Sequence, residues 1–127
     1  MTPETGRYLD KARECLARAR IILDAGVGED AGRNAYLAAF HAAQAFLLAR
    51  TEKVARTHHG VHVQFSRPAA GDPRIEPDLQ RFLSQAYNLK AVADYELGPG
   101  AGVPLERAAA AIEAARRFID RIAALVG

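Results

Sequence analysis

The 127-residue sequence has one cysteine, no tryptophan and little net charge. Because Cys15 is alone, neither an internal disulfide nor a zinc site built from several cysteines can form. Lys and Arg number 17 against 15 Asp and Glu, a formal charge of +2, which argues against a histone-like polybasic binder of nucleic acid. Half of the residues are hydrophobic, so the composition excludes a disordered chain.

Long apolar runs are also lacking. None approaches the roughly 20 residues that cross a bilayer, and residues 1–4 lack the basic and then apolar pattern of a secretory signal. We therefore expect a soluble, cytoplasmic chain with no membrane contact. The length predicts one domain over residues 1–127, since no room is left for a second core.

Alanine is abundant, with 27 copies, which favours closely packed helices over sheets. Apolar residues recur three and four positions apart in four stretches, a spacing typical of helices. These stretches cover about 3–25, 30–53, 77–95 and the residues from 104 onward. The second is apolar on most sides, as is usual for the central helix of a bundle. The sequence therefore predicts an all-α, antiparallel helical bundle, with glycine-rich residues 98–102 as the hinge before the last helix.

The connection over residues 54–75 is long for a compact domain. The spacing of Val61 and Phe65 predicts a short helix within it. It carries three of the four histidines (His58, His59 and His62), and between residues 50 and 74 five basic residues stand against two acidic ones. The polar chemistry of the chain is therefore concentrated here.

Three interpretations of these histidines differ in chemistry. His58 and His62 have the i, i+4 spacing of a metal-chelating pair, but a third ligand would have to be His59 or a distant carboxylate, and no second ligand pair is present. We favour roles in helix capping, in satisfying backbone groups or in binding phosphate. Arg56 and His62, with five residues between them, would suit RNA cleavage, because Arg neutralises phosphate charge and His transfers protons.

Other polar residues have plainer interpretations. Tyr36 and His41 lie in the predicted second helix and are expected to be packing groups, with the imidazole hydrogen-bonded internally. Lys90 and Asp94, four residues apart, form either an exposed intrahelical pair of small value or, with Tyr95, the far wall of a cleft that faces the histidines.

Three blocks of sequence resemble one known family. Residues 35–48 (AYLAAFHAAQAFLL) look like the second helix of HEPN domains of the small stand-alone prokaryotic branch. Residues 57–61 (THHGV), followed by Phe65, are similar to the Thr-His-x-Gly-Val signature of that branch, and residues 93–95 resemble its Ala-Asp-Tyr. The blocks occur in the expected order and span most of the chain.

The resemblance implies a four- to five-helix up-and-down bundle, a homodimer, and a minimal nucleotidyltransferase as partner in a toxin–antitoxin pair. Many HEPN domains are metal-independent endoribonucleases with an Arg-x4–6-His motif before the last long helix. Here Lys90 stands where that Arg would be, and no His follows. Tyr95 corresponds by position to the Tyr that the partner can modify with a nucleotide.

Two functional hypotheses follow. In the first, the chain is the HEPN component of a toxin–antitoxin or defence pair and cleaves or binds RNA, with no metal or cofactor. In the second, it is a degenerate module that binds a nucleotidyltransferase or nucleotide without cleaving RNA. The catalytic candidates are Arg56, His58 and His62; the candidates for binding nucleic acid or nucleotide are His59, Lys90, Asp94 and Tyr95.

Overall fold

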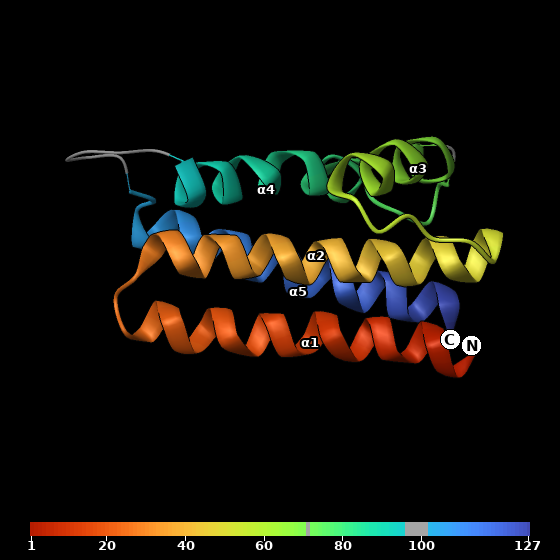
Figure 1. Cartoon of the computed structure of the whole chain (residues 1–127), viewed down its shortest axis with the longest axis horizontal. Helices are drawn as coiled ribbons and strands as arrows, with labels where there is room; N and C mark the ends of the chain where they lie inside the picture. The colour runs from red at the N-terminus through yellow and green to blue at the C-terminus, as the bar shows by residue number, and fades with distance from the viewer. Residues whose placement is uncertain (71, 96–101) are drawn as a thin grey trace.

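The computed structural model describes residues 1–70, 72–95 and 102–127, without the side chains of residues 67–70 and 95. Within these ranges the chain forms five α-helices and no strand. They are α1 (Pro3–Asp24), α2 (Gly28–Thr51), α3 (His58–Ala70), α4 (Pro77–Tyr95) and α5 (Leu105–Val126). The long helices run along one axis, and both termini lie at the same end (Figure 1). The predicted all-α bundle is confirmed, and α3 is the predicted short helix.

Helix α1 begins where the sequence predicts. Thr2 is the N-cap, and its hydroxyl oxygen accepts a hydrogen bond from the backbone N–H of Thr5 at 3.2 Å. Pro3 follows in the first turn, where its missing N–H has no intrahelical partner to lose. The predicted stripe packs inward, with Leu9, Ala12, Leu16 and Ala19 all buried.

Helix α2 is the centre of the bundle. It packs extensively against α1, α4 and α5 and makes a smaller contact with α3. Figure 1 shows it between α1 on one side and the layer of α3 and α4 on the other. Its small side chains allow this close packing on several sides. Seven of its alanines are fully buried: Ala31, Ala35, Ala38, Ala39, Ala42, Ala43 and Ala45.

The boundaries of α2 lie two residues earlier than predicted. The helix begins at Gly28, where a Cβ would lie 1.9 Å from the carbonyl oxygen of Val103, so only glycine allows this approach. It ends because Glu52 adopts a left-handed conformation (φ 61°) while its N–H still bonds to the carbonyl of Leu48. The glycine-rich hinge predicted before α5 falls largely outside the described residues.

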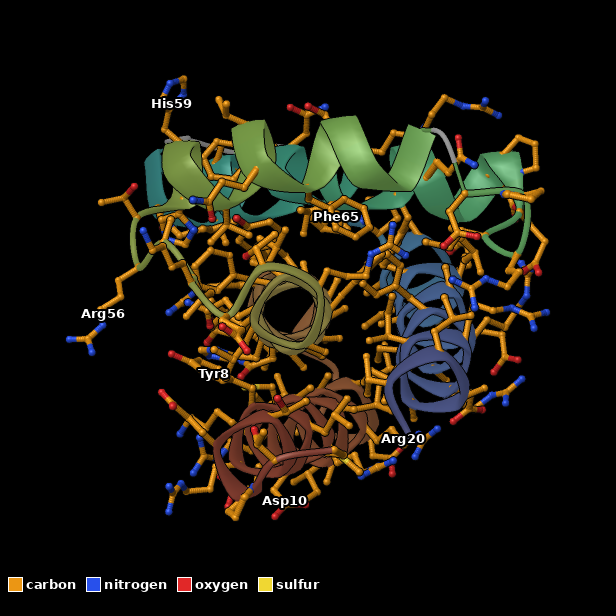
Figure 2. The ribbon with its side chains drawn as sticks, turned by 90° about the vertical axis from the view of Figure 1, so that its right-hand side faces the viewer. Tyr8, Asp10, Arg20, Arg56, His59 and Phe65 are labelled. Atoms are coloured by element: carbon orange, nitrogen blue, oxygen red, sulfur yellow. The ribbon has the colours of Figure 1, made fainter. Side chains whose placement is uncertain are left out.

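Phenylalanines attach α3 to the core. Phe65 is almost fully buried, with ring centroids 5.6 Å from Phe46 on α2 and 5.5 Å from Phe118 on α5. Figure 2 shows the Phe65 side chain pointing from α3 into the bundle. Val61, one turn earlier, is also fully buried. The face of α3 that carries Val61 and Phe65 is therefore oriented by the core.

Some of the basic residues in the 50–74 region form ion pairs within the fold. Asp72 is buried and accepts hydrogen bonds from Arg50 at 3.2 Å and from the guanidinium of Arg74 at 2.9 Å. The contacts of Arg74 with this carboxylate hold the pKa of Asp72 far below its usual range. Two of the five basic residues thus fasten this connection rather than face a ligand. Among the described residues, none of the helices is both long and apolar enough to span a bilayer.

Candidate active site

The first turn of α3 sets the positions of the histidines. The hydroxyl oxygen of Thr57 accepts a hydrogen bond from the backbone N–H of Gly60 at 3.0 Å, and its carbonyl accepts from Val61, so Thr57 is the N-cap. His58 and His62 follow one turn apart and share a face of α3. His59 lies off that face, is exposed, and points away from the bundle (Figure 2).

The hydroxyl of Tyr36 joins the two partly buried histidines. It lies 2.8 Å from Nδ1 of His58 and 3.0 Å from Nε2 of His62, within hydrogen-bond distance of both. Tyr36 belongs to α2 and has no exposed surface, so these nitrogens are the only partners that the described residues provide for its hydroxyl. One buried phenol therefore holds both imidazoles of the predicted catalytic set.

Further aromatic rings complete the cluster. The ring of Tyr87, on α4, lies 5.7 Å from His58 and 5.3 Å from His62 between centroids. The ring centroid of Phe40, on α2, lies 4.7 Å from that of His58. A cavity of about 210 Å³ opens here and is lined by His58, His59, His62 and Tyr87. Such a volume can admit a phosphodiester linkage, whereas pockets for whole small-molecule ligands usually exceed about 300 Å³.

The segment that enters α3 is fastened to both neighbouring helices. Gln44 on α2, itself almost fully buried, donates a hydrogen bond to the carbonyl of Ala55 at 3.1 Å. The N–H of Ala55 in turn donates to the side-chain oxygen of Gln64 on α3 at 3.0 Å. The oxygen of Gln44 accepts from Nδ1 of His41 at 2.8 Å, so His41 has the internal hydrogen bond that the sequence predicts.

Two charged residues of α4, Lys90 and Asp94, act on the histidine cluster. Nζ of Lys90 is 2.5 Å from the carboxylate of Asp94 and 6.0 Å from the centroid of the Tyr87 ring. Nε of Arg33, on α2, lies 3.4 Å from the same carboxylate. Lys90 and Arg33 hold the pKa of Asp94 below its usual value. The Lys90–Asp94 pair is therefore an ion pair linked to α2, and neither residue lines the cavity.

Burial makes the neutral forms of the cluster the stable ones. It lowers the pKa of His58, an effect that the charge of Lys90 reinforces and that of Asp94 opposes. Burial also lowers the pKa of His62, with smaller contributions from His58 and His59. The pKa of Tyr36 is raised far above its ordinary value, mainly by burial. Near neutral pH, two uncharged imidazoles and an uncharged phenol therefore face one another.

The structure brings together only some of the predicted site residues. His58, His59 and His62 line one cavity, whereas Arg56 is exposed and extends away from the helices (Figure 2). Lys90 and Asp94 affect His58 through their charges. The side chain of Tyr95, predicted to bind nucleotide, lies outside the described part of the chain.

Two residues of the cluster do not emerge from the sequence as site residues. Tyr36 is predicted to pack, and it does, but its hydroxyl is also the centre of the site. No sequence pattern assigns a role to Tyr87. One chemical argument could have found Tyr36. A buried tyrosine hydroxyl usually has a hydrogen-bond partner, and the histidines of residues 54–75 are polar side chains with no other assigned role.

A metal site finds no support from the described residues, among which no three His, Cys, Asp or Glu side chains are grouped to hold an ion. Nδ1 of His58 and Nε2 of His62 both face the Tyr36 hydroxyl. The i, i+4 pair is thus occupied by a phenol.

Comparison with known proteins decides the family. The model of the HEPN domain matches residues 5–125. The chain belongs to the HEPN domain family. It is 32% identical over 119 residues to "Putative toxin MJ0605" of Methanocaldococcus jannaschii, covering 94% of this chain and 86% of that protein. It is also 32% identical over 95 residues to "UPF0332 protein glr0978" of Gloeobacter violaceus, covering 75% of each.

The HEPN fold is also seen in a solved structure. The crystal structure of TT1696 from Thermus thermophilus superposes with a TM-score of 0.77, covering 97% of this chain and 98% of that one at 20% identity. At that identity the likeness concerns the fold alone. The resemblance carried by residues 35–48, 57–61 and 93–95 is confirmed at the level of the family, and this HEPN protein is related to the protein named "Putative toxin MJ0605".

Proposed function

We propose that this HEPN protein is a toxin that cleaves RNA without a metal ion, with His58 and His62 as its acid–base pair. The observation that carries the proposal is the cavity of about 210 Å³ lined by three histidines, two of which, His58 and His62, are held by one buried hydroxyl. Perturbed titratable groups gathered at one cavity are typical of active sites.

The chemistry of RNA suits this pair. RNA carries its own nucleophile, the 2′-hydroxyl, so cleavage needs one group to accept the proton of that hydroxyl and another to protonate the departing 5′-oxygen. Imidazole performs either task near neutral pH. The ring of Tyr87 offers a surface on which a base can stack. The expected products are a 2′,3′-cyclic phosphate and a 5′-hydroxyl.

Arg56 is the residue that we expect to hold phosphate. It is exposed, and the described part of the chain offers its guanidinium neither a hydrogen bond nor an ion pair. It precedes His58 by two residues, and His59 is exposed at the cavity. An exposed guanidinium two residues from a cavity-lining histidine can bind the phosphates that flank the cleaved bond. Arg56→Gln is therefore expected to raise KM for RNA more than it lowers kcat.

A second candidate function is favoured by α4. Lys90 stands at the position of the family's catalytic Arg and is paired with Asp94. In that reading, the chain forms a homodimer that binds a minimal nucleotidyltransferase, and Tyr95 accepts a nucleotide from it. The relationship to the protein named "Putative toxin MJ0605" supports an antitoxin partner under either candidate.

The deciding experiment compares three matched substitutions in the purified protein: His58→Asn, His62→Asn and, as control, His41→Asn. His41 lies outside the cavity, and Asn can still donate to Gln44. With a fluorescent single-stranded RNA in excess EDTA, we expect the first two to lose about 10²-fold or more in kcat, with the control close to wild type. Equal activity in all three would refute the proposal. An RNA-inactive wild type that binds the nucleotidyltransferase would establish the second candidate.

A further inference from the structure

We propose that Tyr36 is a positioning residue that couples the protons of His58 and His62, so that one outer ring nitrogen always carries a proton while the other is free to accept one. By outer nitrogens we mean those not bonded to Tyr36, namely Nε2 of His58 and Nδ1 of His62. The coupling is a property of the folded protein, and its use in catalysis rests on the proposed function.

Counting protons gives this result. The neutral cluster holds three titratable protons, one on the phenol and one on each imidazole. Tyr36 contributes a single hydrogen to its two hydrogen bonds, so it donates to one histidine and must accept from the other. Two of the three protons therefore lie within the bonds. The third is left for a single outer nitrogen, on the histidine that accepts from Tyr36.

Two arrangements satisfy both bonds. In the first, Tyr36 donates to Nδ1 of His58 and accepts from Nε2–H of His62, so both rings are Nε2–H tautomers. In the second, it donates to Nε2 of His62 and accepts from Nδ1–H of His58, so both are Nδ1–H tautomers. A mixed pair would leave a buried hydroxyl hydrogen or a ring nitrogen unsatisfied, which is unfavourable because Tyr36 has no exposed surface.

In RNA cleavage the coupling would transfer a proton through the cluster without forming an imidazolium. In the first arrangement, Nδ1 of His62 takes the proton of the 2′-hydroxyl as the 2′-oxygen bonds to phosphorus. Nε2–H of His62 passes its proton to the Tyr36 oxygen, and the phenol passes its own to Nδ1 of His58. Nε2–H of His58 then protonates the 5′-oxygen as its bond to phosphorus breaks.

The balance closes, since one proton enters the cluster and one leaves. The cluster is neutral before and after, and it ends in the second arrangement, from which exchange with water restores the first. The lowered pKa values of both histidines and the raised pKa of Tyr36 agree with a cluster that works in its neutral form.

The tautomers of the wild-type protein test the coupling without any assay of activity. At pH 8, with ¹⁵N-labelled histidine, we expect long-range ¹H–¹⁵N spectra to show His58 and His62 as the same tautomer, or in the same ratio of tautomers. An Nδ1–H ring together with an Nε2–H ring would overturn the proposal. His41 is an internal reference, because its bond to the Gln44 oxygen requires Nδ1–H.

Tyr36→Phe shows whether the hydroxyl is the coupling group. We expect its two histidines to adopt independent tautomer ratios while the His41 signal stays at its wild-type position, which reports that the fold is intact. Identical ratios that persist in the variant would exclude Tyr36 as the link.

The pH dependence of cleavage tests the use of the coupling. We expect wild-type kcat to rise through the histidine range and then stay level up to about pH 9, because the active cluster is neutral. Tyr36→Phe is expected to lose about 10²-fold and to show a bell-shaped profile, since one histidine must then be charged. A bell-shaped wild-type profile would overturn the relay. If the wild type cleaves no RNA, the proposed function fails while the tautomer measurement still decides the coupling.

Discussion

The backbone N–H of Gly60 donates a hydrogen bond to the hydroxyl oxygen of Thr57 at 3.0 Å, at the first turn of α3. A Cβ on residue 60 would lie 2.8 Å from that oxygen and 2.7 Å from the Cβ of Ala55. Residue 60 must therefore be glycine, because any side chain would collide with Thr57 and Ala55. The Thr-His-x-Gly block thus corresponds to the N-terminal cap and first turn of α3. Because His58 is the first residue of that helix, the cap also orients the candidate site.

Gly60→Ala should destabilise the protein by about 1–3 kcal/mol, the usual cost of overpacking, and should shift the imidazole signals of His58 and His62. Urea denaturation measures the first effect and NMR the second. Gly6→Ala is the matched control, because its nearest neighbour would be Sδ of Met1 at 4.0 Å. Because Gly6 lies within α1, Gly6→Ala should increase the free energy of unfolding by about 0.5–1 kcal/mol. A stabilised Gly60→Ala variant would contradict the capping argument.

Phe65→Ala should cost about 3–5 kcal/mol, because the buried ring fills the space between α3 and the core. Val63, two residues earlier on α3, is 43% exposed, so Val63→Ala should stay within about 0.5 kcal/mol of wild type. The comparison is made by urea denaturation at one pH. Similar losses in the two variants would show that α3 is not anchored through Phe65.

Charges on α4 should tune His58 in opposite directions. Lys90 lowers the pKa of this histidine and Asp94 raises it, so Lys90→Gln should raise the pKa and Asp94→Asn should lower it. An NMR titration of the His58 ring measures both. His41 is the internal control, since neither residue contributes to its lowered pKa. Shifts of the same sign in the two variants would argue against a direct electrostatic effect.

Stability should fall as the pH drops from about 7.5 to 5.5. His41, His58 and His62 all have pKa values lowered in the folded state, chiefly by burial. Below about pH 6.5 the unfolded chain therefore binds more protons, and the free energy of unfolding decreases. Urea midpoints across this range measure the slope, which the double variant His58→Asn/His62→Asn should reduce. A midpoint that rises on acidification would show that the rings are charged in the folded protein.

The helices could be predicted because their signals are local. The Thr2 cap, the stripe from Leu9 to Ala19 and the apolar circumference of α2 each depend on spacing within one segment, and the structure agrees with all three. The two-residue error at the start of α2 has a different origin. Gly28 joins the helix in close contact with the carbonyl of Val103, which is distant in sequence and invisible to a local pattern.

The candidate site was likewise predictable only where its features depend on local spacing. Periodicity indicates that Tyr36 is buried and that His58 and His62 share a helical face, since both follow from helical geometry. Which polar groups the buried hydroxyl meets depends on how α3 docks on α2, and its partners lie 22 and 26 residues away. Similarly, composition shows a basic excess around the histidines, but only packing assigns Arg50 and Arg74 to Asp72 and leaves Arg56 exposed. Local spacing is sufficient to specify a helix and its buried face, whereas a hydrogen bond between helices requires the packed core that brings them together.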